Sequence, residues 1–136
     1  MSEHSEAAEL VSQLVAIDSV NPTLVPGGSG EAEIGRFVAD WLEGRGIEVE
    51  LEELAPSRVN VVGRVRGSGG GRTLLLNAHL DTVGFGAMAA PLAPRMEEGR
   101  LYGRGAYDMK GGLAAVLAAA AQLAQGQPLC GDLIIA

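Results

Sequence analysis

The segment TLLLNAHLDTVG, residues 73–84, decides how the rest of the chain is interpreted. Residues 73–78 are apolar on both alternating faces, a pattern typical of a strand that helices cover on both sides. His79 and Asp81 follow, and their side chains would share a face because strand residues two apart point the same way. We therefore expect a polar pair at the carboxyl end of a buried strand, where open α/β sheets place their sites.

Two interpretations of this pair are open from the residues alone. A neutral imidazole can bind a metal through one nitrogen, while a neighbouring carboxylate accepts the other N–H and fixes the tautomer. The alternative is that His79 and Asp81 simply end a strand in a polar surface turn. The chain has only two histidines, and the other, His4, lies in a polar N-terminal leader.

A second polar cluster is GRGAYDMKGG, residues 103–112. It leads into residues 109–125, which are Ala-rich and apolar nearly all round and therefore predict a buried helix. Asp108 stands at the N-cap position of that helix, and capping alone would explain it. However, the surrounding glycines let the backbone approach another group closely, so Asp108 could also reach His79 as a bridging metal ligand.

Apolar periodicity and turn residues predict the other elements. Helices are expected over residues 5–17 and from Ser29 or Gly30 to Gly44, a hairpin over 47–54 and 59–65, a short strand pair near 95–96 and 100–102, and a strand over 132–136. The stretch GSGGGR, residues 67–72, predicts a plain loop because it lacks the Gly-Lys-Ser/Thr ending of a phosphate-binding loop. Helices that alternate with strands predict the α/β class.

Composition limits the classes of function. The 136 residues make one domain or part of one, and 47% hydrophobic residues exclude a disordered chain. A net charge of −7 without a basic stripe argues against a nucleic acid or an anionic membrane as partner. The single Cys130, the lack of a signal peptide and the short apolar run of residues 113–121 predict a cytoplasmic protein.

The two clusters, in this order and spacing, resemble a known family. LLLNAHLDTVG (residues 74–84) and GRLYGRGAYDMKGGLAA (residues 99–115) are similar to motifs of the zinc-dependent metallohydrolases that include acetylornithine deacetylases, succinyl-diaminopimelate desuccinylases, aminoacylases and G-type carboxypeptidases. LVAIDSVNP, residues 14–22, resembles the N-terminal helix and loop of the same family. The resemblance extends over essentially the full chain.

This resemblance implies a three-layer α/β/α zinc-exopeptidase-like catalytic domain that hydrolyses the amide bond of N-acyl amino acids or short peptides. It implies two Zn²⁺ ions, with Co²⁺ as a possible substitute. His79 would be a metal ligand, Asp108 would bridge the two ions, and Asp81 would be the catalytic carboxylate that orients His79. The peptide bond between Asp108 and Met109 would be cis.

The sequence also departs from the family pattern. The family uses a downstream glutamate pair, a further carboxylate and a late histidine, whereas no glutamate follows Glu98 and no histidine follows His79. Glu97 and Glu98 are adjacent but precede Asp108, and they are better explained as a hairpin turn. Residues 1–136 are therefore expected to be a truncated, inactive N-terminal portion of such an enzyme, without its lid or dimerisation domain. A homodimer is the expected assembly of the parent enzyme.

Two alternatives to a deacylase stay open. A di- or tripeptidase or a carboxypeptidase of the same family would share these motifs. A non-catalytic metal-binding or interaction fragment would keep the fold without turnover.

Overall fold

The computed structural model describes residues 6–136, so His4 and Ser5, which the sequence places in the leader and at the start of the first helix, lie outside the described residues. The predicted helices are found with nearly the predicted bounds. They are α1 (Glu6–Val15), α2 (Ala32–Glu43) and α3 (Gly111–Gln125). None of the helices in the described range is long and apolar enough to cross a membrane.

Within residues 6–136, six strands form two sheets. The larger sheet has the order β1-β2-β6-β3, in which β3 and β6 are parallel and the other neighbours are antiparallel. β4 and β5 form a separate hairpin. The bounds are β1 Glu48–Ala55, β2 Arg58–Val65, β3 Leu74–Leu76, β4 Arg95–Glu97, β5 Arg100–Tyr102 and β6 Leu133–Ile135. Both predicted hairpins and the predicted loop at residues 67–72 are confirmed.

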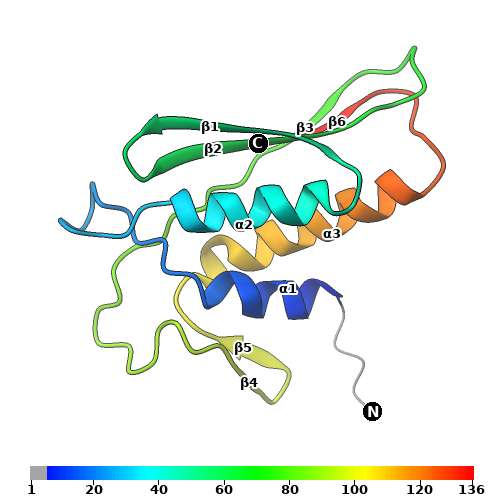
Figure 1. The fold of residues 1–136 in the computed structure, drawn as a ribbon. Helices are drawn as coiled ribbons and strands as arrows, with labels where there is room; N and C mark the ends of the chain where they lie inside the picture. The colour runs from blue at the N-terminus through cyan, green and yellow to red at the C-terminus, as the bar shows by residue number, and fades with distance from the viewer. Residues whose placement is uncertain (1–5) are drawn as a thin grey trace.

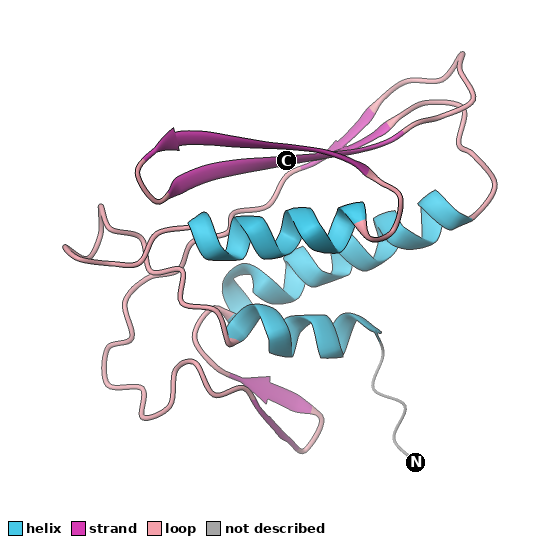
Figure 2. Ribbon diagram, in the orientation of Figure 1, coloured by secondary structure: helices cyan, strands magenta, loops and turns pink. Residues whose placement is uncertain are grey.

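The helices lie on one face of the larger sheet, with α2 packed against β1 and β2 and α1 packed against α3 (Figure 1). The predicted α/β class is therefore confirmed. Of the three layers expected, the described residues supply the sheet and the helices on one face. Figure 2 shows that loops connect β3 to the β4–β5 hairpin, and the candidate site residues of the first motif lie at the start of that connection.

β3 differs from the strand that was predicted. It contains three residues rather than six, and Leu75 is 57% exposed. Leu76 packs against the helical core, so Leu75 points to the opposite face of the sheet because neighbouring strand residues alternate. The prediction of cover on both faces is therefore wrong for the described residues, which place helices on one face only.

The core joins the three helices to the sheet. Its fully buried side chains come from every layer, and they include Leu14 of α1, Ile34 and Leu42 of α2, Leu117 of α3 and Leu133 of β6. A Cβ at Gly35 would collide with Val59 of β2, so a glycine at this position lets α2 lie directly on the strand. This packing fixes the sheet whose β3 end carries the candidate site.

α3 corrects two predictions. The helix begins at Gly111, after the kinked turn η1 (Ala106–Lys110), and Asp108 makes no capping hydrogen bond. Asp108 instead has extended dihedral angles, φ −123° and ψ 96°, and its carboxylate contacts His79. The helix is also not buried all round, since Ala114 is fully buried while Ala115 is exposed.

Candidate metal centre

The segment Asn77–Asp81 leaves the sheet at the carboxyl end of β3. Ala78 N–H donates to the carbonyl oxygen of Ala136 at 2.9 Å, and the Asn77 side chain donates to the same oxygen at 3.1 Å. These bonds tie the segment to the end of the neighbouring strand β6. His79 and Asp81 are thus presented at the strand end, as predicted, although the strand itself stops at Leu76.

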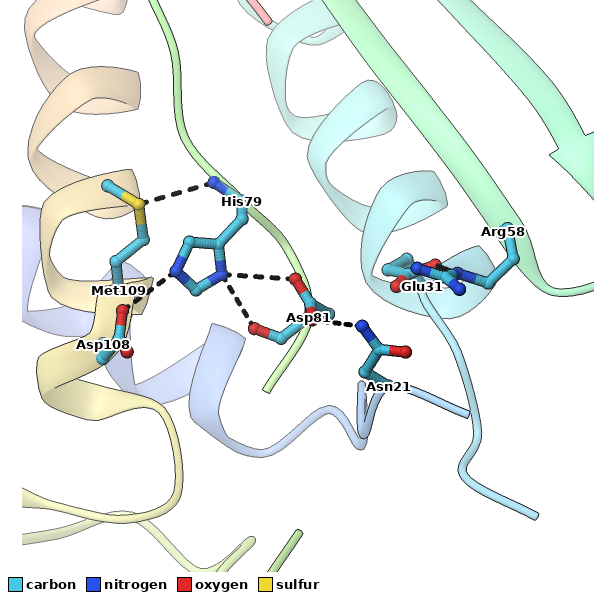
Figure 3. A network of polar contacts seen from close by, with 7 residues as sticks. All are labelled: Asn21, Glu31, Arg58, His79, Asp81, Asp108 and Met109. Atoms are coloured by element: carbon cyan, nitrogen blue, oxygen red, sulfur yellow. Dashed lines mark hydrogen bonds and ion pairs between the residues drawn. The ribbon is translucent and has the colours of Figure 1, made fainter. Parts of the chain in front are cut away.

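His79 and Asp81 lie against each other (Figure 3). The Nδ1 atom of His79 is 3.0 Å from the carbonyl oxygen of Asp81 and 3.3 Å from its Oδ1. Two oxygens of one residue therefore face the same ring nitrogen. This geometry favours the tautomer with the proton on Nδ1, which leaves Nε2 as the nitrogen that can bind a metal.

Asp108 approaches the other side of the ring. Its Oδ1 lies 2.9 Å from Nε2 of His79, and its side chain is 78% exposed (Figure 3). The backbone reaches this position through Gly105, at φ 80°, and the peptide bond between Asp108 and Met109 is cis, as the family resemblance implies. The backbone N–H of His79 also donates to the Met109 sulfur at 3.4 Å. The two sequence motifs therefore meet at one imidazole.

Both ring nitrogens of His79 face oxygen acceptors, which a neutral imidazole with its one N–H cannot satisfy together. The arrangement is satisfied by an imidazolium or by a cation between Nε2 and Asp108. Burial acts to lower the pKa of His79, but the hydrogen bonds to Asp108 and Asp81 and their charges raise it overall. The surroundings of His79 therefore favour a positive charge, a proton or a cation, between Nε2 and Asp108.

The spacing of the two donors fits a metal ion. Two ligands of one tetrahedral zinc, each at about 2 Å, lie about 3.3 Å apart, so a small opening of the 2.9 Å His79–Asp108 contact would admit the ion. Across residues 6–136, however, no group of three or more His, Cys, Asp or Glu side chains is placed to hold a metal. The described residues thus offer two donors and a carboxylate that orients one of them.

Two residues that support the site were missed in the sequence. The Asn21 side chain donates from Nδ2 to Asp81 Oδ2 at 2.8 Å. Lys110, the only lysine of the chain, is buried and donates from Nζ to the carbonyls of Leu14 and Ile17, each at 2.8 Å. Burial lowers the pKa of Lys110 to about 8, and the charge of Asp18 opposes that shift. For Lys110, the sequence signal was that the only lysine of the chain lies in the second motif.

A cavity of about 550 Å³ lies beside the site. His79 and Asp81 line it together with residues of β2 and with Glu31 and Arg58, whose side chains form an ion pair with Nε 2.6 Å from Oε2. Figure 3 shows this pair on the far side of Asn21 from His79.

Glu97 and Glu98 belong to the β4–β5 hairpin. Glu97 ends β4, Glu98 lies in the turn before β5, and both are exposed. Glu97 pairs with Arg95 of its own strand, with Oε1 2.6 Å from Nε. The predicted hairpin is confirmed with Glu98 in its turn, whereas Glu97 is the last paired residue of β4.

Residues 75–136 match the model of peptidase family M20/M25/M40. An acetylornithine deacetylase of Aliivibrio fischeri (strain MJ11) is 34% identical over 117 residues, which are 84% of this chain and 30% of that protein. A succinyl-diaminopimelate desuccinylase of Leptothrix cholodnii is 33% identical over 133 residues, which are 93% of this chain and 33% of that protein. The chain therefore spans about a third of the length of these curated relatives.

The fold is also found in solved structures. An M20 family metallo-carboxypeptidase from Sulfolobus solfataricus matches with a TM-score of 0.82 and 23% sequence identity. The match covers 97% of this chain and 30% of that protein. Nearly every described element therefore has a counterpart in one portion of a larger metallopeptidase.

Proposed function

This chain resembles peptidase family M20/M25/M40 in sequence and in fold, and from that premise we propose that it is the N-terminal portion of the catalytic domain of a zinc-dependent amidohydrolase. Its parent cleaves the amide bond of an N-acyl amino acid, in the manner of a deacetylase or desuccinylase. The names of the two curated relatives support this substrate class. We place the parent in the cytoplasm because Cys130 is a single, exposed cysteine. From the family resemblance we propose that the parent forms a homodimer.

The observation that carries the proposal is the position of the His79 ring between two carboxylates. Nε2 of His79 and the carboxylate of Asp108 would hold zinc, and Asp108 would be shared with a second ion. Asp81 keeps the proton of His79 on Nδ1 and so keeps Nε2 free to bind. Bound zinc supplies a Lewis acid that polarises the substrate carbonyl and lowers the pKa of water.

The part of the chemistry that these residues do not supply is proton transfer. A catalytic zinc usually has three protein ligands, and a general base must lie within hydrogen-bond reach of the attacking water. The described residues place two metal donors together, whereas Glu97 ends β4 and Glu98 lies in the turn before β5. We therefore propose that the base and the further ligands come from outside these 136 residues, and that the chain alone has no turnover.

The leading alternative within the family is a peptidase that acts on dipeptides or tripeptides or at a carboxyl terminus. The match to a metallo-carboxypeptidase supports a shared fold and does not distinguish this activity from deacylation. Because the metal donors serve either reaction, the residues that select the substrate lie elsewhere in the parent. A metal-binding fragment without catalysis is the alternative of another class.

Calorimetric titration of the 136-residue chain with zinc or cobalt tests the proposal. The expected result is one binding process weaker than micromolar, because two donors leave the ion largely hydrated. His79→Ala and Asp108→Ala should each abolish it. His4→Ala removes the other histidine and Glu97→Ala an unrelated carboxylate, so both controls should bind as the parent does.

An assay against N-acetyl amino acids and small dipeptides, with zinc or cobalt added, completes the experiment. No hydrolysis is expected. Turnover that Glu97→Ala or Glu98→Ala removes would contradict the site, and binding that survives His79→Ala would contradict the metal centre.

A further inference from the structure

The side chain of Asn21 is held from both ends. Its Nδ2 donates to Asp81 Oδ2 at 2.8 Å (Figure 3). Its Oδ1 accepts the Thr23 backbone N–H at 2.8 Å. The two bonds need opposite polarity at the two ends of the amide, so flipping it would break both. Asn21 therefore presents an N–H donor to Asp81 in one fixed direction.

The loop that carries Asn21 is itself tied to the site. Asn21 N–H donates to the Thr82 carbonyl and Thr82 N–H donates to the Ser19 carbonyl, both at 2.9 Å. Val20 and Thr82 thereby form an isolated parallel bridge next to Asp81. These bonds fix the backbone on both sides of the Asn21–Asp81 contact, and the bond from Thr23 N–H to Oδ1 restrains the Asn21 side chain itself.

The two oxygens of Asp81 are thus divided between two neighbours. Oδ2 accepts from Asn21, and Oδ1 lies 3.3 Å from His79 Nδ1. A neutral amide orients the carboxylate without neutralising its charge, whereas a lysine or arginine at this position would compete with His79 for that charge.

We propose that Asn21 is a positioning residue that fixes the Asp81 carboxylate and through it holds the proton of His79 on Nδ1. The loop after α1 is then a working part of the metal centre, because it keeps Nε2 free on the Asp108 side. This role rests on the proposed function for its purpose, but the hydrogen-bond relay can be tested without any metal.

A purely structural role for Asn21 makes a different prediction. Its Oδ1 accepts from Thr23 in an Asx turn, and an aspartate would make the same turn. Asn21→Asp keeps the shape and this acceptor, but it places an oxygen where Asp81 Oδ2 needs a donor. The variant therefore separates the Asx turn at Thr23 from the chain of contacts that links Asn21 through Asp81 to His79.

The experiment measures the nitrogen chemical shifts of the His79 ring in the metal-free 136-residue chain, well above the pKa of His79. Nδ1 keeps the Asp81 carbonyl at 3.0 Å in every variant, and Nε2 faces Asp108 Oδ1 at 2.9 Å. Relative to the parent, Asn21→Asp and Asn21→Ala should therefore shift the proton population from Nδ1 towards Nε2, because the Asp81 carboxylate is no longer held beside Nδ1. Gln122→Glu makes the same amide-to-acid change at an exposed position of α3 and should leave the ring as it is. Thermal unfolding checks that each variant is folded.

Zinc titration gives a second readout. Asn21→Asp should weaken binding about tenfold, the lower end of the range for outer partners of a metal-ligating histidine. A folded Asn21→Asp chain with the parent's tautomer and zinc affinity would overturn the positioning role. If instead His79→Ala leaves zinc binding unchanged, the metal centre fails, and the tautomer shift still decides the role of Asn21.

Discussion

His79 couples protonation to stability at the scale of single residues. Its folded-state pKa is raised, so the folded state binds a proton more tightly than the unfolded chain does. The stability it contributes is fully present below the unfolded pKa, about 6.5, and is lost as the pH rises through the folded pKa. Urea unfolding of the metal-free parent and of His79→Gln should therefore differ more at about pH 5.5 than at about pH 8.5. An equal difference at both pH values would mean that the contacts to Asp81 and Asp108 do not form in solution.

Lys110 fastens the turn that carries Asp108 to the end of α1. Lys110→Met removes the donor to the Leu14 and Ile17 carbonyls and should lower the free energy of unfolding by about 2 kcal/mol. Chemical denaturation at about pH 6, where a lysine of pKa about 8 is charged, measures the loss. Arg36→Met removes an exposed cation from α2 and should change stability by less than about 0.5 kcal/mol. Equal effects of the two substitutions would argue that the buried ammonium has no structural role.

The positions of the candidate donors could be predicted from the sequence, whereas the supporting residues could not. His79 and Asp81 share a face because they are two residues apart, and the family resemblance places Asp108 with them. Asn21 acts across 60 positions through one hydrogen bond, and Lys110 acts across more than 90 positions through two. Such contacts leave no periodic pattern, so only the folded chain reveals them.

At the scale of elements, α3 has a buried face and an exposed one. Ala114→Glu would place a charge on a fully buried position and should destabilise the chain by about 3–5 kcal/mol. Ala115→Glu makes the same change one residue later, at an exposed position, and should leave the melting temperature nearly unchanged. Thermal unfolding of the pair measures the difference. If Ala115→Glu is the more damaging, the orientation of α3 is wrong.

The elements that carry a strong pattern were predicted well. α2 and the β1–β2 hairpin have clear 3.6- and 2-residue periods, and the structure places them nearly as expected. The start of α3 was predicted two residues early because Asp108 has the chemistry of an N-cap, while its backbone is extended and its carboxylate faces His79. Residue type alone cannot distinguish a cap from a side chain that serves a site.

At the scale of the whole molecule, the apolar sequence of β3 indicates a covering layer that the described residues do not contain. Leu75 was expected under a helix, yet it is exposed on the face of the sheet opposite the three helices. The chain also spans about a third of its curated relatives. Both observations support the proposal that these residues are one portion of a larger catalytic domain.

The most direct test of the metal centre is anomalous diffraction at the zinc edge from crystals of this chain grown with zinc. We expect a peak between Nε2 of His79 and the carboxylate of Asp108, about 2 Å from each, with Asp81 still on Nδ1. Zinc located elsewhere, or bound to His79 through Nδ1, would contradict the assignment of the donors and with it the proposed hydrolase site.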